Sequence, residues 1–139
     1  NSTKEDILNF SDSFVKFLLF KYLKKKSKKV IKKKNIIKIL ISASPNFYVE
    51  KFAKILHFDL VFSTKINLSK NIGGIIGRNC YGKQKLNIIK KLKLDPKKMY
   101  FFTDSNSDMP LITYCEKTYV IPKTIYDKFY LREYEKLKW

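Results

Sequence analysis

Two carboxylates, Asp104 and Asp108, follow an apolar stretch over Tyr100–Thr103, with a short polar turn between them. Carboxylates at the carboxyl end of a buried strand lie where open α/β sheets bind their ligands. Two of them suit a hard cation such as Mg²⁺, which takes oxygen ligands and usually works beside a phosphate group. The same residues also fit an Asp/Ser/Asn turn that caps a following helix, and this pattern alone does not separate the two interpretations.

A second polar turn follows the β-branched, mostly apolar run Ile36–Ile41, which predicts a buried strand of a parallel sheet. The turn is Ser42–Pro45, in which Ser44 can cap a helix that has Pro45 at its first position. A strand, a small hydroxyl turn and a helix N-terminus form a ready anion site, because backbone N–H groups and the helix dipole point at it.

Two lysines, Lys83 and Lys85, follow Gly82 at the start of a predicted helix. Apolar residues recur at helical spacing behind them at Leu86, Ile89 and Leu92. A lysine at a helix start is usually solvated, so these lysines indicate chemistry only in combination with the two polar turns.

The remaining pattern predicts the elements that must position these residues. Helices are expected over 4–23, 45–56 and 125–139, strands over 60–62, 99–103 and 118–121, and a β-hairpin or irregular excursion within 66–76. Strands that alternate with helices imply an α/β fold, with a mostly parallel sheet and helices on both faces. We expect a helical, Lys-rich segment over 1–35 and an α/β core over 36–139.

The net charge is +18, and much of it lies in Lys21–Lys34. This run has no Arg and only one aromatic, Tyr22, whereas nucleic-acid modules usually interleave such residues with their lysines. We therefore expect no specific nucleic-acid partner. The run is expected to form a solvated basic helix face, and nonspecific contact of this face with anionic surfaces stays open.

Three features bear on location. No apolar run is long enough to span a bilayer, and the polar, acidic start over Asn1–Asp6 is not a signal peptide. Cys80 and Cys115 fit no metal spacing, so two buried or free thiols in a reducing compartment are expected. Together these features predict a cytoplasmic protein.

Three segments, in this order, resemble motifs of the haloacid dehalogenase-like (HAD) hydrolases, in particular the phosphoserine-phosphatase-like branch. Ile39–Pro45 resembles the second motif, Asn79–Leu86 the third and Phe101–Leu111 the fourth. The resemblance covers residues 36 to 121 and implies a Rossmann-like parallel sheet flanked by helices. It also implies a Mg²⁺-dependent phosphomonoester hydrolase, in which an Asp attacks the substrate and forms an aspartyl-phosphate that water then cleaves.

The resemblance implies roles for single residues in phosphate binding. Ser42 would donate a hydrogen bond to a phosphate oxygen, and the backbone N–H of Ala43 would assist it. Lys85 would neutralise the charge of the phosphate and the nucleophile. Lys83 is its rival for that role, but the family pattern places the lysine three residues after Gly82.

The resemblance also implies a metal site. Asp104 would bind Mg²⁺, and Asp108 would bind it through water or orient Lys85. Electrostatic stabilisation of this kind does most of the work in phosphoryl transfer. The expected substrate is a small phosphorylated metabolite or a phosphorylated lipid headgroup.

The family's first motif, an apolar strand ending in D-x-D, is absent from the 139 residues, so the nucleophile and the general acid/base are missing. In the family this strand lies between the strands of the second and fourth motifs. Its absence predicts either unpaired edges on those strands or direct pairing between them. Because Asn1–Thr3 could follow a D-x-D, we expect a chain truncated just after its first motif.

The family's helical cap is expected to be reduced or missing, with Ser13–Phe20 resembling its first helix. Two alternatives to a phosphatase stay open. One is a catalytically inactive remnant of the family that still binds phosphate. The other is a basic module that binds nucleic acid or a membrane through Lys21–Lys34.

Overall fold

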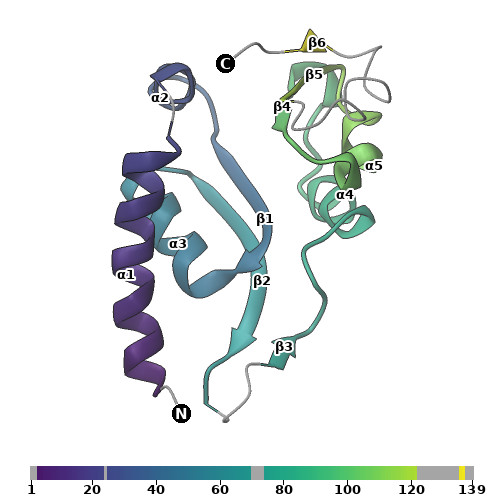
Figure 1. Cartoon of the computed structure of the whole chain (residues 1–139). Coiled ribbons are helices and arrows are strands. Elements are labelled where there is room, and N and C mark those ends of the chain that lie inside the picture. The colour runs from purple at the N-terminus through teal and green to yellow at the C-terminus, as the bar shows by residue number, and fades with distance from the viewer. Residues whose placement is uncertain (1–2, 24, 70–73, 122–134, 137–139) are drawn as a thin grey trace. The chain divides into compact units, whose positions relative to one another are not determined.

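The computed structural model describes residues 3–23, 25–69, 74–121 and 135–136 (Figure 1). The chain divides into two compact units, Asn1–Cys80 and Tyr81–Trp139. Within the described residues, no helix is both long enough and apolar enough to cross a membrane. The expected division into 1–35 and 36–139 stays a prediction.

The first unit begins with helix α1 (Lys4–Lys21), close to the predicted bounds. The side chain of Thr3 accepts a hydrogen bond from the Asp6 backbone N–H, and the Asp6 carboxylate accepts one from the Thr3 backbone N–H. This capping box explains why the helix starts at Lys4. The backbone and then the side-chain hydrogen bonds from Thr3 lower the pKa of the Asp6 carboxyl below its usual 3.8.

A short helix, α2 (Lys25–Ile31), follows α1, and helix α3 (Asn46–Ile55) lies between α1 and the strands (Figure 1). Strand β1 (Ile39–Pro45) pairs in parallel with β2 (Leu60–Asn67), and β3 (Gly74–Ile76) pairs antiparallel with β2. The hairpin expected within 66–76 is therefore confirmed for its described strands. The buried apolar side chains of these two helices are Val15 on α1 and Val49 and Ala53 on α3.

Strand β1 differs from the prediction at both ends. It begins at Ile39 rather than Ile36, because its partner β2 begins at Leu60 and the first paired residues are Ile39 and Leu60. It continues to Pro45, which pairs with Thr64. Ser44 therefore does not cap α3, and the residue at the cap is Pro45.

The second unit begins with helix α4 (Lys83–Lys91) and a 3₁₀ turn η1 (Pro96–Lys98). Strand β4 (Tyr100–Thr103) follows, then the 3₁₀ turn η2 (Asn106–Asp108) and helix α5 (Met109–Ile112). Strands β5 (Lys117–Val120) and β6 (Glu135–Lys136) complete a parallel sheet of order β4-β5-β6. Ile112 and Val120 form its buried core, against which Phe101 and Met109 pack.

The helix predicted over 125–139 falls mainly on residues outside the described part of the chain, namely 122–134 and 137–139. At Glu135–Lys136 the prediction is wrong, because these two residues form β6. Their pairing with β5 is a tertiary interaction that the local pattern of the sequence does not contain.

The strands of the second and fourth motif-like segments are both edge strands of their sheets. Among the described residues, β1 is paired only with β2, and β4 is paired only with β5. The expectation that a strand is missing between them stays a prediction. Each edge presents a row of backbone groups that an additional strand could pair with.

Candidate functional site

A compact loop leads from β4 into α5. The Ser105 side chain accepts a hydrogen bond from the Ser107 backbone N–H, and the two hydroxyls lie 2.7 Å apart. The loop leaves Asp104 exposed at its start and buries Asp108, a residue that is 3% exposed, at its end. The two carboxylates predicted to act together thus lie in one loop but in different environments.

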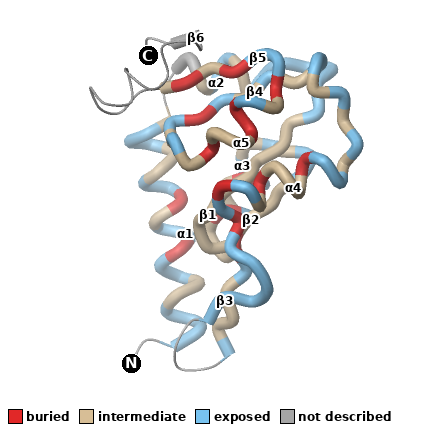
Figure 2. Tube along the Cα trace, turned by 90° about the vertical axis from the view of Figure 1, so that its right-hand side faces the viewer, coloured by how far each residue is buried: buried red, intermediate tan, exposed pale blue. Residues whose placement is uncertain are grey.

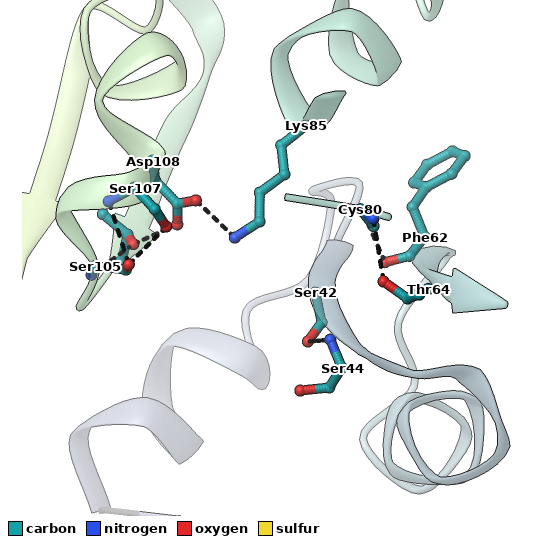
Figure 3. Close-up of polar contacts among 10 residues, drawn as sticks. Ser42, Ser44, Phe62, Thr64, Cys80, Lys85, Ser105, Ser107 and Asp108 are labelled. Atoms are coloured by element: carbon teal, nitrogen blue, oxygen red, sulfur yellow. Dashed lines mark hydrogen bonds and ion pairs between the residues drawn. The ribbon is translucent and has the colours of Figure 1, made fainter. Parts of the chain in front are cut away.

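Asp108 divides its two oxygens between two partners. Its Oδ1 lies 2.7 Å from Lys85 Nζ, and this ion pair joins the start of α4 to the loop after β4 (Figure 3). Its Oδ2 accepts a hydrogen bond of 2.7 Å from the Thr103 hydroxyl. Lys85 is itself buried, at 8% exposure. A buried charge is costly unless it is paired, so this pair and Thr103 make the burial of Asp108 tolerable.

The structure separates the two candidate lysines. Lys85 is buried and paired with Asp108, whereas Lys83 is exposed. Residues two apart on an α-helix point to different sides, so only one of them can face the loop. That Lys85 rather than Lys83 serves the phosphate site stays a prediction.

Gly82 sets the entry into α4. Its φ of +52° and ψ of −123° are angles that residues with a Cβ rarely adopt. A Cβ at this position would lie 3.5 Å from the Ser107 carbonyl oxygen. The glycine therefore lets the chain turn beside the loop after β4, and the helix that begins next carries Lys85.

Ser42 and Ala43 belong to the first unit. The pairing of β1 with β2 runs from Ile39 to Ile41 and resumes only at Pro45, so residues 42–44 form a bulge. The Ser42 hydroxyl oxygen accepts a hydrogen bond of 3.1 Å from the Ser44 backbone N–H (Figure 3). Within the described residues the hydroxyl makes no second hydrogen bond, so its proton can be donated to a ligand.

The carboxylates fit a magnesium ion only in part. In the described part of the chain, no three His, Cys, Asp or Glu side chains are grouped to hold a metal. Mg²⁺ usually keeps several waters and takes one or two carboxylates together with substrate phosphates, so the pair Asp104 and Asp108 is a sufficient protein contribution. Asp108 Oδ1 is buried and, apart from its ion pair, accepts no hydrogen bond from the described residues.

Thr103 is the site residue that the sequence pattern did not single out. Its hydroxyl donates to Asp108 and also accepts a hydrogen bond of 3.1 Å from the Ser105 backbone N–H. The available signal was a hydroxyl residue at the end of an otherwise aromatic strand, Tyr100–Thr103. Alternation of buried and exposed residues along that strand does not reveal which polar group Thr103 contacts.

Comparison with known proteins adds family information. Residues 5–113 match the family model of the haloacid dehalogenase-like hydrolases, whereas a search of curated proteins found no significant match.

Three solved structures resemble the chain. A protein of unknown function from Bordetella pertussis Tohama I has a TM-score of 0.80 and 13% identity, over 99% of this chain and 68% of that one. A HAD family hydrolase from Salmonella enterica serovar Typhi has a TM-score of 0.64 and 14% identity, over 78% and 39%. A probable phosphoserine phosphatase from Vibrio cholerae has a TM-score of 0.59 and 9% identity, over 72% and 32%. At these identities the likeness shows the fold.

Proposed function

Because this chain belongs to the haloacid dehalogenase-like hydrolase family, we propose that it forms the phosphate- and metal-binding part of a phosphomonoester hydrolase that depends on Mg²⁺. The observation that carries the proposal is the buried ion pair between Lys85 and Asp108. Burying both charges carries a desolvation cost, and use of the lysine's charge in phosphate binding would explain why the pair is kept.

Lys85 supplies the positive charge for the substrate phosphate. Asp108 holds the ammonium group 2.7 Å from its Oδ1, so the lysine is oriented before a substrate arrives. Preorganised charge of this kind stabilises the equatorial oxygens of a transferring phosphoryl group. The resemblance to the family's second motif implies that the Ser42 hydroxyl and the Ala43 backbone N–H would bind other phosphate oxygens, and this part of the proposal stays a prediction.

Asp104 and Asp108 are the residues that would hold Mg²⁺ in this proposal. The bound ion would supply further neutralisation of the phosphoryl oxygens. Asp104 is exposed and accessible to solvent, which suits a residue that binds an ion together with water and substrate.

The substrate class is a small phosphorylated metabolite or a phosphorylated lipid headgroup. The likeness to a probable phosphoserine phosphatase supports this class through the fold. A cytoplasmic location stays a prediction, supported by the two buried cysteines, Cys80 and Cys115.

We propose that the nucleophile comes from a D-x-D strand outside these 139 residues. No D-x-D occurs in the sequence, and β1 and β4 each have an edge that no described strand occupies. If no such strand exists, the absent aspartates favour the second candidate function, an inactive remnant of the family that binds phosphate.

The test is hydrolysis of an aryl phosphate with Mg²⁺ or with a chelator. It is run on this chain and on a version extended upstream to any D-x-D in the reading frame. We expect activity only in the extended form with Mg²⁺. Asp104→Asn should lower that activity by about a hundredfold or more, because it removes a metal ligand.

The matched control is Asp95→Asn. Asp95 is also exposed, it caps η1 through Lys97, and Asn retains the capping group, so activity should be unchanged. Activity that resists both the chelator and Asp104→Asn would refute the proposed metal site. Inactivity of both forms, combined with binding of inorganic phosphate that Lys85→Met abolishes, would identify the remnant.

A further inference from the structure

The charge of this chain is concentrated in one segment. Between Asp12 and Glu50 the sequence has eleven lysines and no carboxylate, and it also has no arginine. The described, exposed lysines in this segment are Lys16, Lys21, Lys28, Lys29, Lys32, Lys33 and Lys34. Since no acidic side chain in the segment neutralises them, this part of the first unit carries a local positive field that attracts anions.

Large apolar side chains are exposed in the same segment. Phe20 is 93% exposed, Phe17 47% and Tyr22 59%, at the C-terminal end of α1. Ile36 and Ile37, just before β1, are 46% and 67% exposed. The buried positions of α1, Ser11 and Val15, leave this end of the helix largely uncovered (Figure 2). Exposed apolar side chains that gather in a patch mark interaction sites.

The aromatic and basic groups are interleaved rather than separate. The Phe17 and Tyr22 rings meet edge to face, with centroids 5.8 Å apart. Lys21 Nζ lies 5.2 Å from the Phe17 centroid and 5.7 Å from the Tyr22 centroid. Apolar rings beside lysines are typical of helices that lie at a membrane interface, with rings toward the acyl chains and ammonium groups toward anionic headgroups.

We propose that this surface binds the face of an anionic lipid bilayer. The surface, here named the basic–aromatic surface, consists of Phe17, Phe20, Lys21, Tyr22, Lys28, Lys29, Lys32, Lys33, Lys34, Ile36 and Ile37. Binding is peripheral, since no described helix can span a membrane. The proposal goes beyond the proposed hydrolysis, because none of these residues belongs to the phosphate or metal site.

Two features favour lipid over nucleic acid as the partner. Ile36 and Ile37 have no flat face on which a base could stack, but they can insert among acyl chains. The segment also lacks arginine, which provides the bidentate contacts and base stacking common in nucleic-acid sites.

The test is co-sedimentation with phosphatidylcholine vesicles that do or do not contain phosphatidylserine. We expect binding only to the vesicles with phosphatidylserine, and weaker binding as salt rises to about 0.15 M and above. Binding that is equal for both vesicle types, or absent from both, would overturn the proposal.

Two pairs of variants separate the surface from overall charge and hydrophobicity. Replacing Lys28, Lys29, Lys32 and Lys33 by Gln should weaken binding by at least about tenfold. Its charge-matched control replaces by Gln four exposed lysines outside the basic–aromatic surface, namely Lys54, Lys91, Lys97 and Lys98. This control should change vesicle binding by less than about threefold. Equal losses in the two variants would show that net charge alone is responsible.

The apolar contribution is tested with Phe20→Ser and Ile37→Ser together, against Ile75→Ser and Ile76→Ser, which are 52% and 53% exposed on β3. Only the first pair should weaken vesicle binding, while circular dichroism shows that both variants remain folded. Tighter binding to duplex DNA or single-stranded RNA at the same salt, unaffected by the first pair, would identify nucleic acid as the partner instead. Asp104→Asn should leave vesicle binding unchanged, so the failure of this proposal is distinguishable from failure of the proposed hydrolase.

Discussion

The Thr103 hydroxyl donates a hydrogen bond of 2.7 Å to Oδ2 of Asp108, and both side chains are buried in the second unit. The other oxygen of Asp108 lies 2.7 Å from the ammonium group of Lys85. Thr103 therefore holds the carboxylate from one side while the lysine meets it from the other. Three residues from β4, η2 and α4 are coupled through this one carboxylate.

Thr103→Val tests this coupling, because valine keeps the shape of threonine and removes its hydroxyl. A buried carboxylate oxygen loses its hydrogen bond, so we expect the free energy of unfolding to fall by about 1–3 kcal/mol. Thr103→Ser keeps the hydroxyl and should cost clearly less. Urea unfolding measures both variants, and a cost near zero for Thr103→Val would show that the hydrogen bond contributes nothing.

Lys85→Met should destabilise the protein by about 3 kcal/mol, because it leaves the buried Asp108 carboxylate without its charged partner. The matched control is Lys83→Met, two residues earlier and exposed, which should change the free energy of unfolding by less than about 0.5 kcal/mol. The double variant Lys85→Met with Asp108→Leu removes both charges and should recover part of the loss. Similar costs for Lys83→Met and Lys85→Met would contradict the observed pairing.

Gly82→Ala should lower the free energy of unfolding by about 1–3 kcal/mol, because its φ of +52° is strained for any residue with a Cβ. Gly74→Ala is the control, since a Cβ there would meet nothing within 4 Å and its φ is not positive. Thermal unfolding of the two variants compares them directly. A melting temperature for Gly82→Ala at or above that of Gly74→Ala would show that the turn at Gly82 is not strained.

The Cys115 thiol gives a prediction for alkaline pH. Burial raises its pKa from 9.0 to about 11. The folded protein therefore binds this proton more tightly than the unfolded chain does. The contribution of the protonated thiol to the free energy of unfolding is complete below pH 9.0 and is lost as the pH rises toward 11. We expect the stability of the wild-type protein to fall over this range more steeply than that of Cys115→Ala.

Alkylation provides a second readout for Cys115. Mass spectrometry of peptides after iodoacetamide treatment should show slow modification of Cys115 in the folded protein near pH 9.0 and fast modification in urea. Rapid modification of the folded protein would mean that the thiol is accessible and its pKa is ordinary.

The local sequence predicted the elements around the site well. The aromatic run before Asp104 became β4, and Met109–Ile112 became helix α5, with Pro110 in its first turn. The apolar spacing over residues 4–23 became α1, which starts where Thr3 and Asp6 form a capping box. These features depend on residues within a few positions of one another, so periodicity and capping chemistry suffice to find them.

Only the tertiary structure decided which charges meet and how far the strands extend. β1 runs on to Pro45 because β2 continues beside it, and this pairing changed the expected cap of α3. The family pattern favoured Lys85 over Lys83, but the pairing of Lys85 with Asp108 and the exposure of Lys83 come from the tertiary structure. Thr103 belongs to the candidate site because its hydroxyl donates a hydrogen bond to Asp108. The sequence by itself thus determined the segments and their chemistry. The ion pair, the bulge and the two strand edges depend on contacts between segments far apart in the chain, whose energies no local pattern contains.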